Sequence, residues 1–427
     1  MLYAGASKKL ITPEKPATLV GVPRDYLVNK VYSDLWARGL VLSMGKTSAA
    51  IVVLDLVGID LPFVRKVRRN VQERTGIRNV LISATHNHSG PAIREGIYND
   101  SCSYGPIDKA WKEMVEEKIV EVITEASNGK KQVTIGIGKA KIKGVAASRR
   151  WKLANGEIWW ADKLCMGEKP AAAVISKGIA DEEMGMLCFK GKNGRMVAVL
   201  LNYACHPWIW FEELISAEIP GEVVKIVEKN YPEAVCIFSN GCGGDVTAGA
   251  NLGVIPKGKE AALRWWKEQH KRMGRLITRP MGPALTTIRY IQPTNMTVTT
   301  RKVKLILQDR YLHPQNHHEC HINKSIKLLA ERKEKQVEGN KLTTEVQVIR
   351  IDNINIVAFP SEMFVKFGLK IKREFPNTLV IGYANDFTSY IPTSKAYDEG
   401  YYEVGAALAV KGSGEILLKE ALACLRA

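Results

Sequence analysis

Two histidines, His86 and His206, follow buried apolar stretches of the chain, and Glu362 follows a third. Imidazole nitrogens and a carboxylate oxygen are common zinc ligands, and a set of three leaves one coordination position open. Zinc held in this way lowers the pKa of its bound water to about 7 and polarises a carbonyl group. These residue types therefore indicate hydrolysis with zinc as the cofactor. Their spacing is weakly specific, because they form no compact motif such as HExxH.

The apolar stretches that precede these residues are typical of buried β-strands. A helical pattern over residues 61–74, closed by Gly76, joins the first two strands into a βαβ unit. Ser361 is expected to cap a helix running to about residue 375. Sites in open α/β sheets form beyond the carboxyl ends of strands, so the residues that follow these strands are expected to converge. The predicted strands cover residues 48–57, 79–84, 196–203, 234–239, 354–359 and 378–383.

The composition is that of a globular protein, and the strand and helix patterns predict the α/β class. Of 427 residues, 46% are hydrophobic and 25% are charged, as in ordinary soluble domains. We expect one large catalytic domain over residues 1–427, with a mixed, mostly buried β-sheet flanked by helices and no C-terminal β-sandwich. The chain has no apolar run of signal-peptide or membrane-span length, so we expect a cytoplasmic protein without a transmembrane segment.

The net charge of +17 would attract anionic partners without choosing among them. No nucleic-acid-binding motif is present, so we expect no nucleic-acid partner. The densest basic stretch, residues 257–279, reads as a helix with two interpretations. Either it touches a membrane surface peripherally, or it is an ordinary surface helix with a basic outer face. In the second case the inward residues are Ala261, Trp265, Met273 and Leu276.

Cysteines and a second histidine cluster add little to the functional interpretation. The eight cysteines contain no CxxC pair, so a disulfide framework is not expected. A histidine-rich stretch has metal-binding residue types, but its spacing matches no standard zinc frame. We favour a structural or merely exposed role for it, and metal binding is the alternative. Its members are His313, His317, His318, Cys320 and His321.

Several longer segments resemble the neutral/alkaline (non-lysosomal) ceramidase family, in particular its N-terminal catalytic domain. The resemblance spans nearly the whole chain, and the THxHSGP and NYxCHP elements are its more specific parts. The opening residues 4–13 and 34–42 also look like the beginning of that family, and residues 397–403 look like a later part of it. The central segments are THNHSGP (85–91), NYACHP (202–207), NGCGGDVT (240–247), PSEMF (360–364) and ANDFTSYIPT (384–393).

The resemblance implies a role for each matching residue. His86, His206, Glu362 and Tyr390 would ligate zinc, and Tyr390 would also belong to the catalytic group. His88 would handle protons or orient the site, and in an extended segment we expect it to point differently from His86. Arg149 would lie near the polar group of the substrate and help to hold an oxyanion. The alternative for Arg149 is an ordinary surface charge.

Two positions depart from the family's pattern. Thr247 stands where the ceramidases have a serine, which leaves both a nucleophilic and a positioning role open. Phe387 stands where the family commonly has a tyrosine, so Tyr390 is the phenolic ligand that remains. The secreted ceramidases also carry an export signal and a C-terminal β-sandwich, and their absence here counts against long-chain ceramide as the substrate.

The sequence as a whole predicts a ceramidase-like, zinc-dependent amidohydrolase of lipid metabolism. We expect zinc-activated water to attack an N-acyl bond in a small-molecule or lipid-like substrate, with His88, Arg149, Thr247 and Tyr390 as catalytic residues. One alternative is a zinc-dependent esterase or other acyl hydrolase. Another is a non-catalytic basic binding protein that retains the fold. The acyl-chain length and the oligomeric state stay open.

Overall fold

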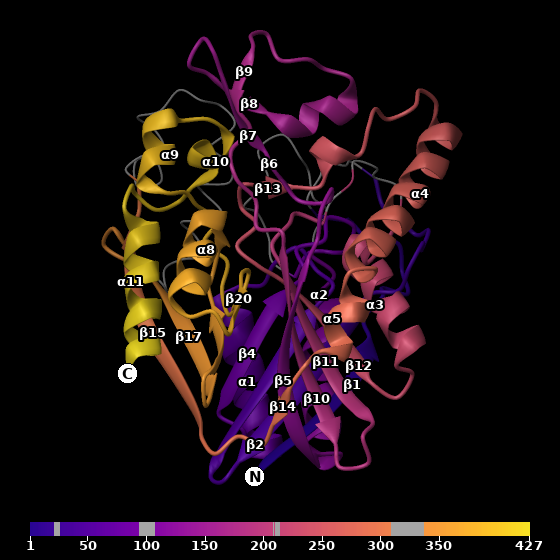
Figure 1. Ribbon diagram of the computed structural model, residues 1–427, viewed down its shortest axis with the longest axis vertical. Coiled ribbons are helices and arrows are strands. Elements are labelled where there is room, and N and C mark those ends of the chain that lie inside the picture. The colour runs from indigo at the N-terminus through magenta and orange to yellow at the C-terminus, as the bar shows by residue number, and fades with distance from the viewer. Residues whose placement is uncertain (21–25, 94–106, 208, 210–213, 309–336) are drawn as a thin grey trace.

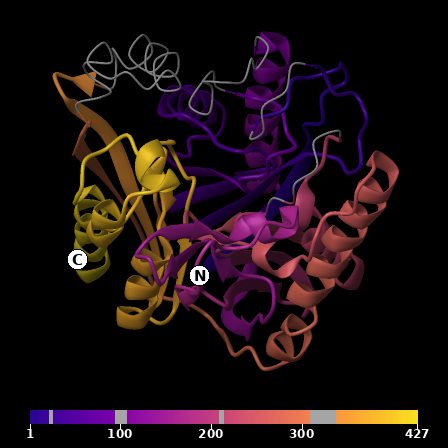
Figure 2. The ribbon, with the colours of Figure 1, turned by 90° about the horizontal axis from the view of Figure 1, so that it is seen from above.

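Two β-sheets lie face to face, and helices cover their outer faces (Figures 1 and 2). The structure is a computed structural model that describes residues 1–20, 26–93, 107–207, 209, 214–308 and 337–427. The histidine-rich stretch around residues 313–321 lies outside these ranges. The expected α/β class with mixed sheets flanked by helices is confirmed. The division of the strands between two facing sheets was not predicted.

The larger sheet has the strand order β12-β11-β10-β5-β1-β2-β3-β4, with β14 beside β5. It is mixed, because β3 and β4 are parallel, as are β11 and β12, whereas the other neighbours are antiparallel. The strands are β1 (Leu2–Leu10), β2 (Trp36–Met44), β3 (Thr47–Leu54), β4 (Asn79–Ala84), β5 (Lys131–Lys141), β10 (Glu183–Gly191), β11 (Met196–Tyr203), β12 (Val235–Asn240) and β14 (Tyr290–Ile291).

The smaller sheet has the order β15-β17-β18-β20, with β16 beside β17. Side chains alternate between the two faces of a strand, so each sheet offers one apolar face to the other. Leu40 and Leu187 of the larger sheet share a buried core with Ile349 and Ile356 of the smaller one. The strands are β15 (Met296–Ile306), β16 (Val337–Glu338), β17 (Lys341–Ile351), β18 (Ile354–Ala358) and β20 (Thr378–Ile381).

Three groups of helices bury the outer faces of the sheets. Helices α1 and α2 cover one half of the larger sheet, α3, α4 and α5 cover its other half, and α8 and α11 cover the smaller sheet (Figure 1). The predicted βαβ unit is present: helix α1 and strand β4 lie within one residue of their predicted bounds, because Asp60 caps α1 and left-handed Gly76 ends it, whereas β3 ends at Leu54, three residues earlier than predicted. The helices are α1 (Leu61–Thr75), α2 (Lys109–Asn128), α3 (Glu218–Asn230), α4 (Lys259–Thr278), α5 (Met281–Thr286), α8 (Val365–Glu374) and α11 (Ser413–Arg426).

The predicted cap at Ser361 is wrong. The chain stays extended after Ser361 and forms the short strand β19 (Glu362–Met363), which pairs with β21 (Tyr390–Ile391). Helix α8 therefore begins only at Val365, and the Ser361 hydroxyl hydrogen-bonds to that of Thr388 instead. Because the helix begins later, Glu362 and Tyr390 pair as strand residues, which places their carboxylate and phenol side by side.

The basic helix α4 is a surface helix with an apolar inner face, as the second interpretation of this stretch proposed. Met273 is buried, whereas Trp265 is only half-buried; its neighbour Trp266 is fully buried and donates from Nε1 to the carbonyl of Ile209 at 3.0 Å. None of the helices in the described part of the chain has the length and apolar character needed to cross a bilayer. The six cysteines that the structure describes are free and buried, which agrees with the expected lack of a disulfide framework among them.

Candidate metal centre

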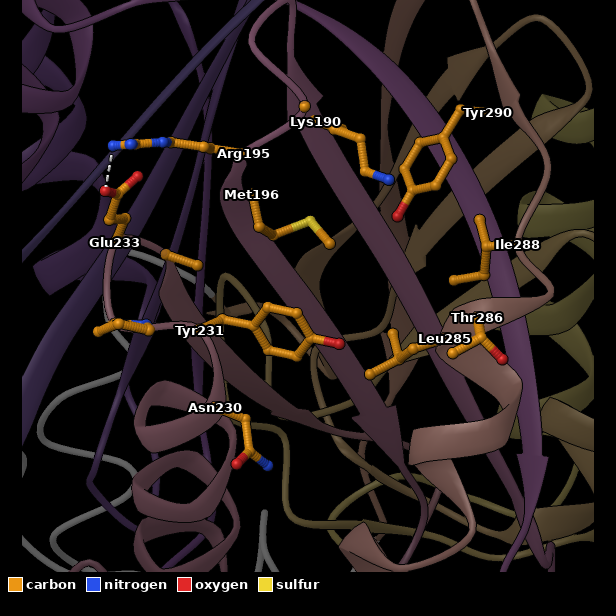
Figure 3. Close-up of a pocket in the computed structure, with 13 residues that line it drawn as sticks. Lys190, Arg195, Met196, Asn230, Tyr231, Glu233, Leu285, Thr286, Ile288 and Tyr290 are labelled. Atoms are coloured by element: carbon orange, nitrogen blue, oxygen red, sulfur yellow. Dashed lines mark hydrogen bonds and ion pairs between the residues drawn. The ribbon is translucent and has the colours of Figure 1, made fainter.

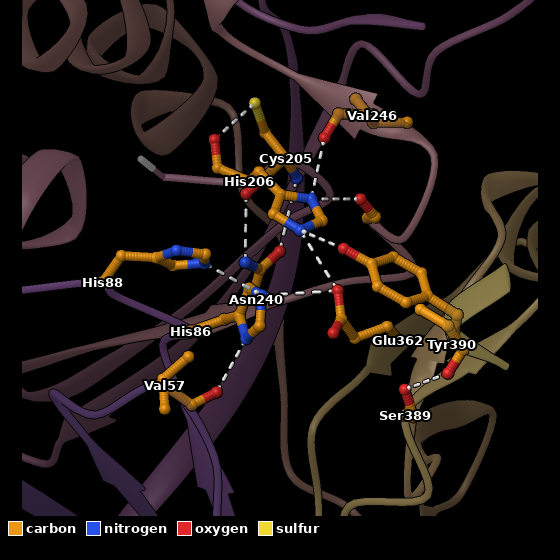
Figure 4. Close-up of polar contacts among 12 residues, drawn as sticks. Val57, His86, His88, Cys205, His206, Asn240, Val246, Glu362, Ser389 and Tyr390 are labelled. Carbon is orange, nitrogen blue, oxygen red and sulfur yellow. Dashed lines mark hydrogen bonds and ion pairs between the residues drawn. The ribbon is translucent and has the colours of Figure 1, made fainter. Parts of the chain in front are cut away.

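Four of the predicted site residues come together where the chain leaves β4, β11 and the end of the smaller sheet (Figure 4). The Oε2 atom of Glu362 lies 3.3 Å from Nε2 of His86 and 3.1 Å from Nε2 of His206. The hydroxyl of Tyr390 lies 3.5 Å from the same His206 nitrogen. All four side chains are at most 2% exposed.

Backbone pairing and one asparagine hold these segments in place. Asn240, at the end of β12, donates from Nδ2 to the carbonyls of Thr85 at 3.1 Å and Cys205 at 3.0 Å, so it ties the residues before both histidines together. In the parallel pair β19 and β21, Glu362 lies directly opposite Tyr390. Gly244 permits this arrangement, because a Cβ there would overlap the backbone carbonyl of Glu362.

The ring nitrogens that face the carboxylate carry no proton. Nδ1 of His86 lies 2.6 Å from the carbonyl of Val57, and Nδ1 of His206 lies 2.7 Å from that of Gly243. A carbonyl only accepts, so Nδ1 carries the hydrogen in both rings and Nε2 presents a lone pair. Burial lowers the pKa of His86 to about 3 and that of His206 well below its usual value, so both rings are neutral near pH 7.

This donor set suits a metal ion. Oε2 of Glu362 lies 3.3 Å from Nε2 of His86 and 3.1 Å from Nε2 of His206, and a carboxylate this close to two imidazole lone pairs is repelled unless a cation or a proton lies among them. Zinc bonds of about 2.0–2.1 Å in tetrahedral geometry place the donor atoms roughly 3.3 Å apart. The residues present therefore fit a zinc ion, with the backbone carbonyls of Val57 and Gly243 as the outer partners that orient the two imidazoles.

The expectation that His88 points differently from His86 is wrong. The two rings meet edge to face with centroids 4.8 Å apart, and their Nε2 atoms are 3.3 Å from each other. Side chains two residues apart share one side of an extended segment, and His86 itself has a left-handed backbone with φ of 64°. Nitrogens of His86, His88 and His206 all lie within 4.8 Å of one another, so this trio could also hold a metal.

Glu218 positions the loop that carries His88. Its carboxylate accepts from the backbone N–H of His88 at 3.1 Å and from the hydroxyl of Ser89 at 2.8 Å. His88 is half-buried, whereas His86 and His206 are fully buried. Its ring therefore lies between the buried donor set and the outside of the protein, a position suited to moving protons.

Arg149 belongs to the site and is not a surface charge, because its side chain is buried. Its Nη1 atom donates to the Tyr390 hydroxyl at 3.2 Å and lies 3.4 Å from Nε2 of His206. Its Nη2 atom donates to Asp162 at 3.1 Å. A guanidinium next to the donor set is well placed to oppose negative charge that develops on a carbonyl oxygen.

Asp162 links two of the predicted catalytic residues and was missed in the sequence analysis. One of its carboxylate oxygens accepts from Arg149, and the other accepts from the hydroxyl of Thr247. The same Thr247 oxygen accepts from the backbone N–H of Gly249 at 2.9 Å. Asp162 lies in the short 3₁₀ helix Ala161–Met166, outside the predicted strand ends, and a lone aspartate there belongs to no motif.

Aromatic rings line one side of the centre. The Arg149 guanidinium lies 5.5 Å from the centre of the Trp160 ring, which stacks on Tyr402 at 5.9 Å. Tyr402 in turn meets Tyr390 edge to face at 5.7 Å, and it is 46% exposed. This wall therefore runs from the buried donor set to the surface, and it offers an apolar flank to a substrate. Tyr402 falls within the segment 397–403 that resembled the ceramidases, but neither ring was predicted as a site residue.

Comparison with known proteins identifies the fold. No family model matches the chain, and no curated protein matches it in sequence. Among solved structures, the neutral ceramidase from Pseudomonas aeruginosa superposes with a TM-score of 0.74 at 18% identity, over 100% of this chain and 74% of that chain. A structure described as a ceramidase complexed with C2 gives a TM-score of 0.72 at 18% identity, over 100% of this chain and 75% of that one. The chain thus has a neutral-ceramidase-like fold, as the sequence motifs predicted.

Proposed function

We propose that this protein is a zinc-dependent hydrolase of N-acyl amide bonds, acting on a lipid-like substrate. One observation carries the proposal: two neutral imidazoles and a carboxylate converge at 3.1–3.3 Å inside a fold that solved ceramidases share. His86, His206, Glu362 and Tyr390 would hold the ion. When bound, zinc lowers the pKa of a water molecule to about 7 and polarises a carbonyl group.

The chain's own residues divide the remaining work. Arg149 and the hydroxyl of Tyr390, 3.2 Å apart, would donate to the carbonyl oxygen as negative charge develops on it. Asp162 would keep the guanidinium turned toward this point through its 3.1 Å ion pair. Nε2 of His88 would take a proton from the attacking water and return one to the leaving amine, which is the usual division for a general acid and base.

Thr247 is the alternative nucleophile, and its hydrogen bonds argue against that role. Its proton is donated to Asp162, and its oxygen accepts from Gly249. Asp162 would have to accept that proton in full, which would weaken its ion pair with buried Arg149. Leaving a buried charge without its partner is costly, so we favour attack by water and a positioning role for Thr247.

Comparing an amide with an ester that has the same acyl group tests which type of bond the protein cleaves. We expect the zinc-loaded protein to release a fluorescent amine from N-acyl amides, with kcat/KM depending on acyl length because the aromatic wall contacts the chain. Fluorescence assays of amides and matched esters with two to sixteen carbons would measure this. Cleavage of esters alone would support the esterase alternative, and turnover of neither class at any length would support the non-catalytic one.

A further inference from the structure

A groove with a volume of about 730 Å³ lies away from the metal centre, at the beginning of β11 (Figure 3). Strand β11 begins at Met196, on the floor of this groove, and ends three residues before His206. Eight residues of strand span roughly 25 Å, so the groove and the metal centre are separate. Its volume falls within the range of about 300–1,000 Å³ that small-molecule sites occupy.

The floor of the groove is apolar. Met196, Leu285, Ile288 and the rings of Tyr231 and Tyr290 line it, and all five are half-buried side chains packed against the core beneath. Figure 3 shows Met196 between the two tyrosines, with Leu285 and Ile288 on the side of the α5–β14 connection. An aliphatic chain lying here would cover apolar surface that the protein itself leaves partly open.

One end of the groove carries the ammonium group of Lys190. Nζ of Lys190 lies 4.2 Å from the centre of the Tyr290 ring, and the residue is half-buried. Within the ranges that the structure describes, no carboxylate forms an ion pair with Lys190. Arg195, on the same hairpin, is by contrast paired with Glu233. The groove thus combines an apolar floor with an unneutralised ammonium group at its edge.

We propose that this groove binds a small amphipathic carboxylate, with the acid group at Lys190 and the apolar tail over Met196. Lys190 supplies a charge-assisted hydrogen bond, the floor supplies apolar contact, and the paired Arg195 leaves Lys190 as the cation available to the ligand. The inference goes beyond the proposed function, because it uses no residue of the metal centre.

Titration with octanoate, followed through the methyl signal of Met196, tests this site. In protein labelled with [methyl-¹³C]methionine, with the signal assigned through Met196→Leu, octanoate should shift the Met196 resonance saturably. Lys190→Gln should weaken octanoate binding about three- to tenfold. The loss is moderate because the Lys190 ammonium and the octanoate carboxylate would be only partly shielded from water. Lys192→Gln, an exposed lysine on the same hairpin that does not line the groove, should leave the affinity unchanged.

Octanamide, which has the same tail without the charge, should bind as weakly to the wild type as octanoate binds to Lys190→Gln. A Met196 signal that octanoate leaves unmoved would overturn the proposal, as would equal affinities for octanoate in Lys190→Gln and Lys192→Gln. The His206→Ala variant should bind octanoate like the wild type. The outcome is therefore independent of whether the protein hydrolyses amides.

Discussion

Replacing His206 with alanine is expected to abolish both zinc binding and hydrolysis while the protein still folds. The ring supplies one of three donors that converge at 3.1–3.3 Å, and its Nδ1 hydrogen bond to Gly243 leaves Nε2 with no role other than as an acceptor. Elemental analysis of the purified variant should find far less than one zinc per chain, and amide hydrolysis should fall to background.

His270→Ala is the matched control for this loss. His270 is also fully buried, but it lies in α4 and hydrogen-bonds through Nδ1 to the carbonyl of Trp266 at 2.9 Å. Removing the buried ring leaves a cavity, so this variant should have a lower free energy of unfolding. It should keep its zinc and its activity. Full zinc occupancy in His206→Ala, with circular dichroism like that of the wild type, would show that the assigned donor set is wrong.

His88→Ala is expected to separate turnover from metal binding. If His88 moves protons, the variant should retain its zinc while kcat falls by about 10²- to 10⁴-fold, the usual span for a general acid or base. The half-buried position of His88 and its loop contact with Glu218 agree with this role, and the four proposed ligands His86, His206, Glu362 and Tyr390 remain for the ion. Measuring zinc content and kcat on the same preparation shows whether turnover is lost while the metal is retained.

The competing assignment makes His88 a ligand, because its Nε2 atom lies 3.3 Å from that of His86. In that case His88→Ala would lose zinc to the same extent as His206→Ala, and adding excess zinc would restore part of its activity. That result would replace the division of roles proposed above with a site built on His86, His88 and His206.

Local sequence patterns predicted those strands whose apolar side chains must be buried in the core. Strand β4 (Asn79–Ala84) and strand β11 (Met196–Tyr203) have the predicted boundaries, because uninterrupted apolar runs can be satisfied only by burial on both faces of a sheet. The histidines at their ends follow from the same argument, since a polar residue directly after a buried strand lies at the edge of the sheet. The convergence of these ends was a prediction from topology, and the contacts of Asn240 show how it is achieved.

Features that depend on long-range contacts could not be predicted. Ser361 is a good cap locally, yet pairing between Glu362 and Tyr390 across β19 and β21 keeps the chain extended there. Asp162 acquires its role only from its contacts with Arg149 and Thr247, which lie 13 and 85 residues away in sequence. The left-handed backbone conformation of His86, with φ of 64°, likewise could not be predicted from its residue type.

Restoration of amide hydrolysis by zinc is the measurement that tests the central claim most directly. Wild-type protein stripped with a chelator should lose its N-acyl amidase activity, and titration with zinc should restore it along a curve that breaks at one ion per chain. The same zinc titration of the His206→Ala variant should restore no amidase activity until zinc is in large excess. Full amide hydrolysis by protein shown to be free of metal, or no hydrolysis after one equivalent of zinc has bound, would contradict a zinc-dependent amidase.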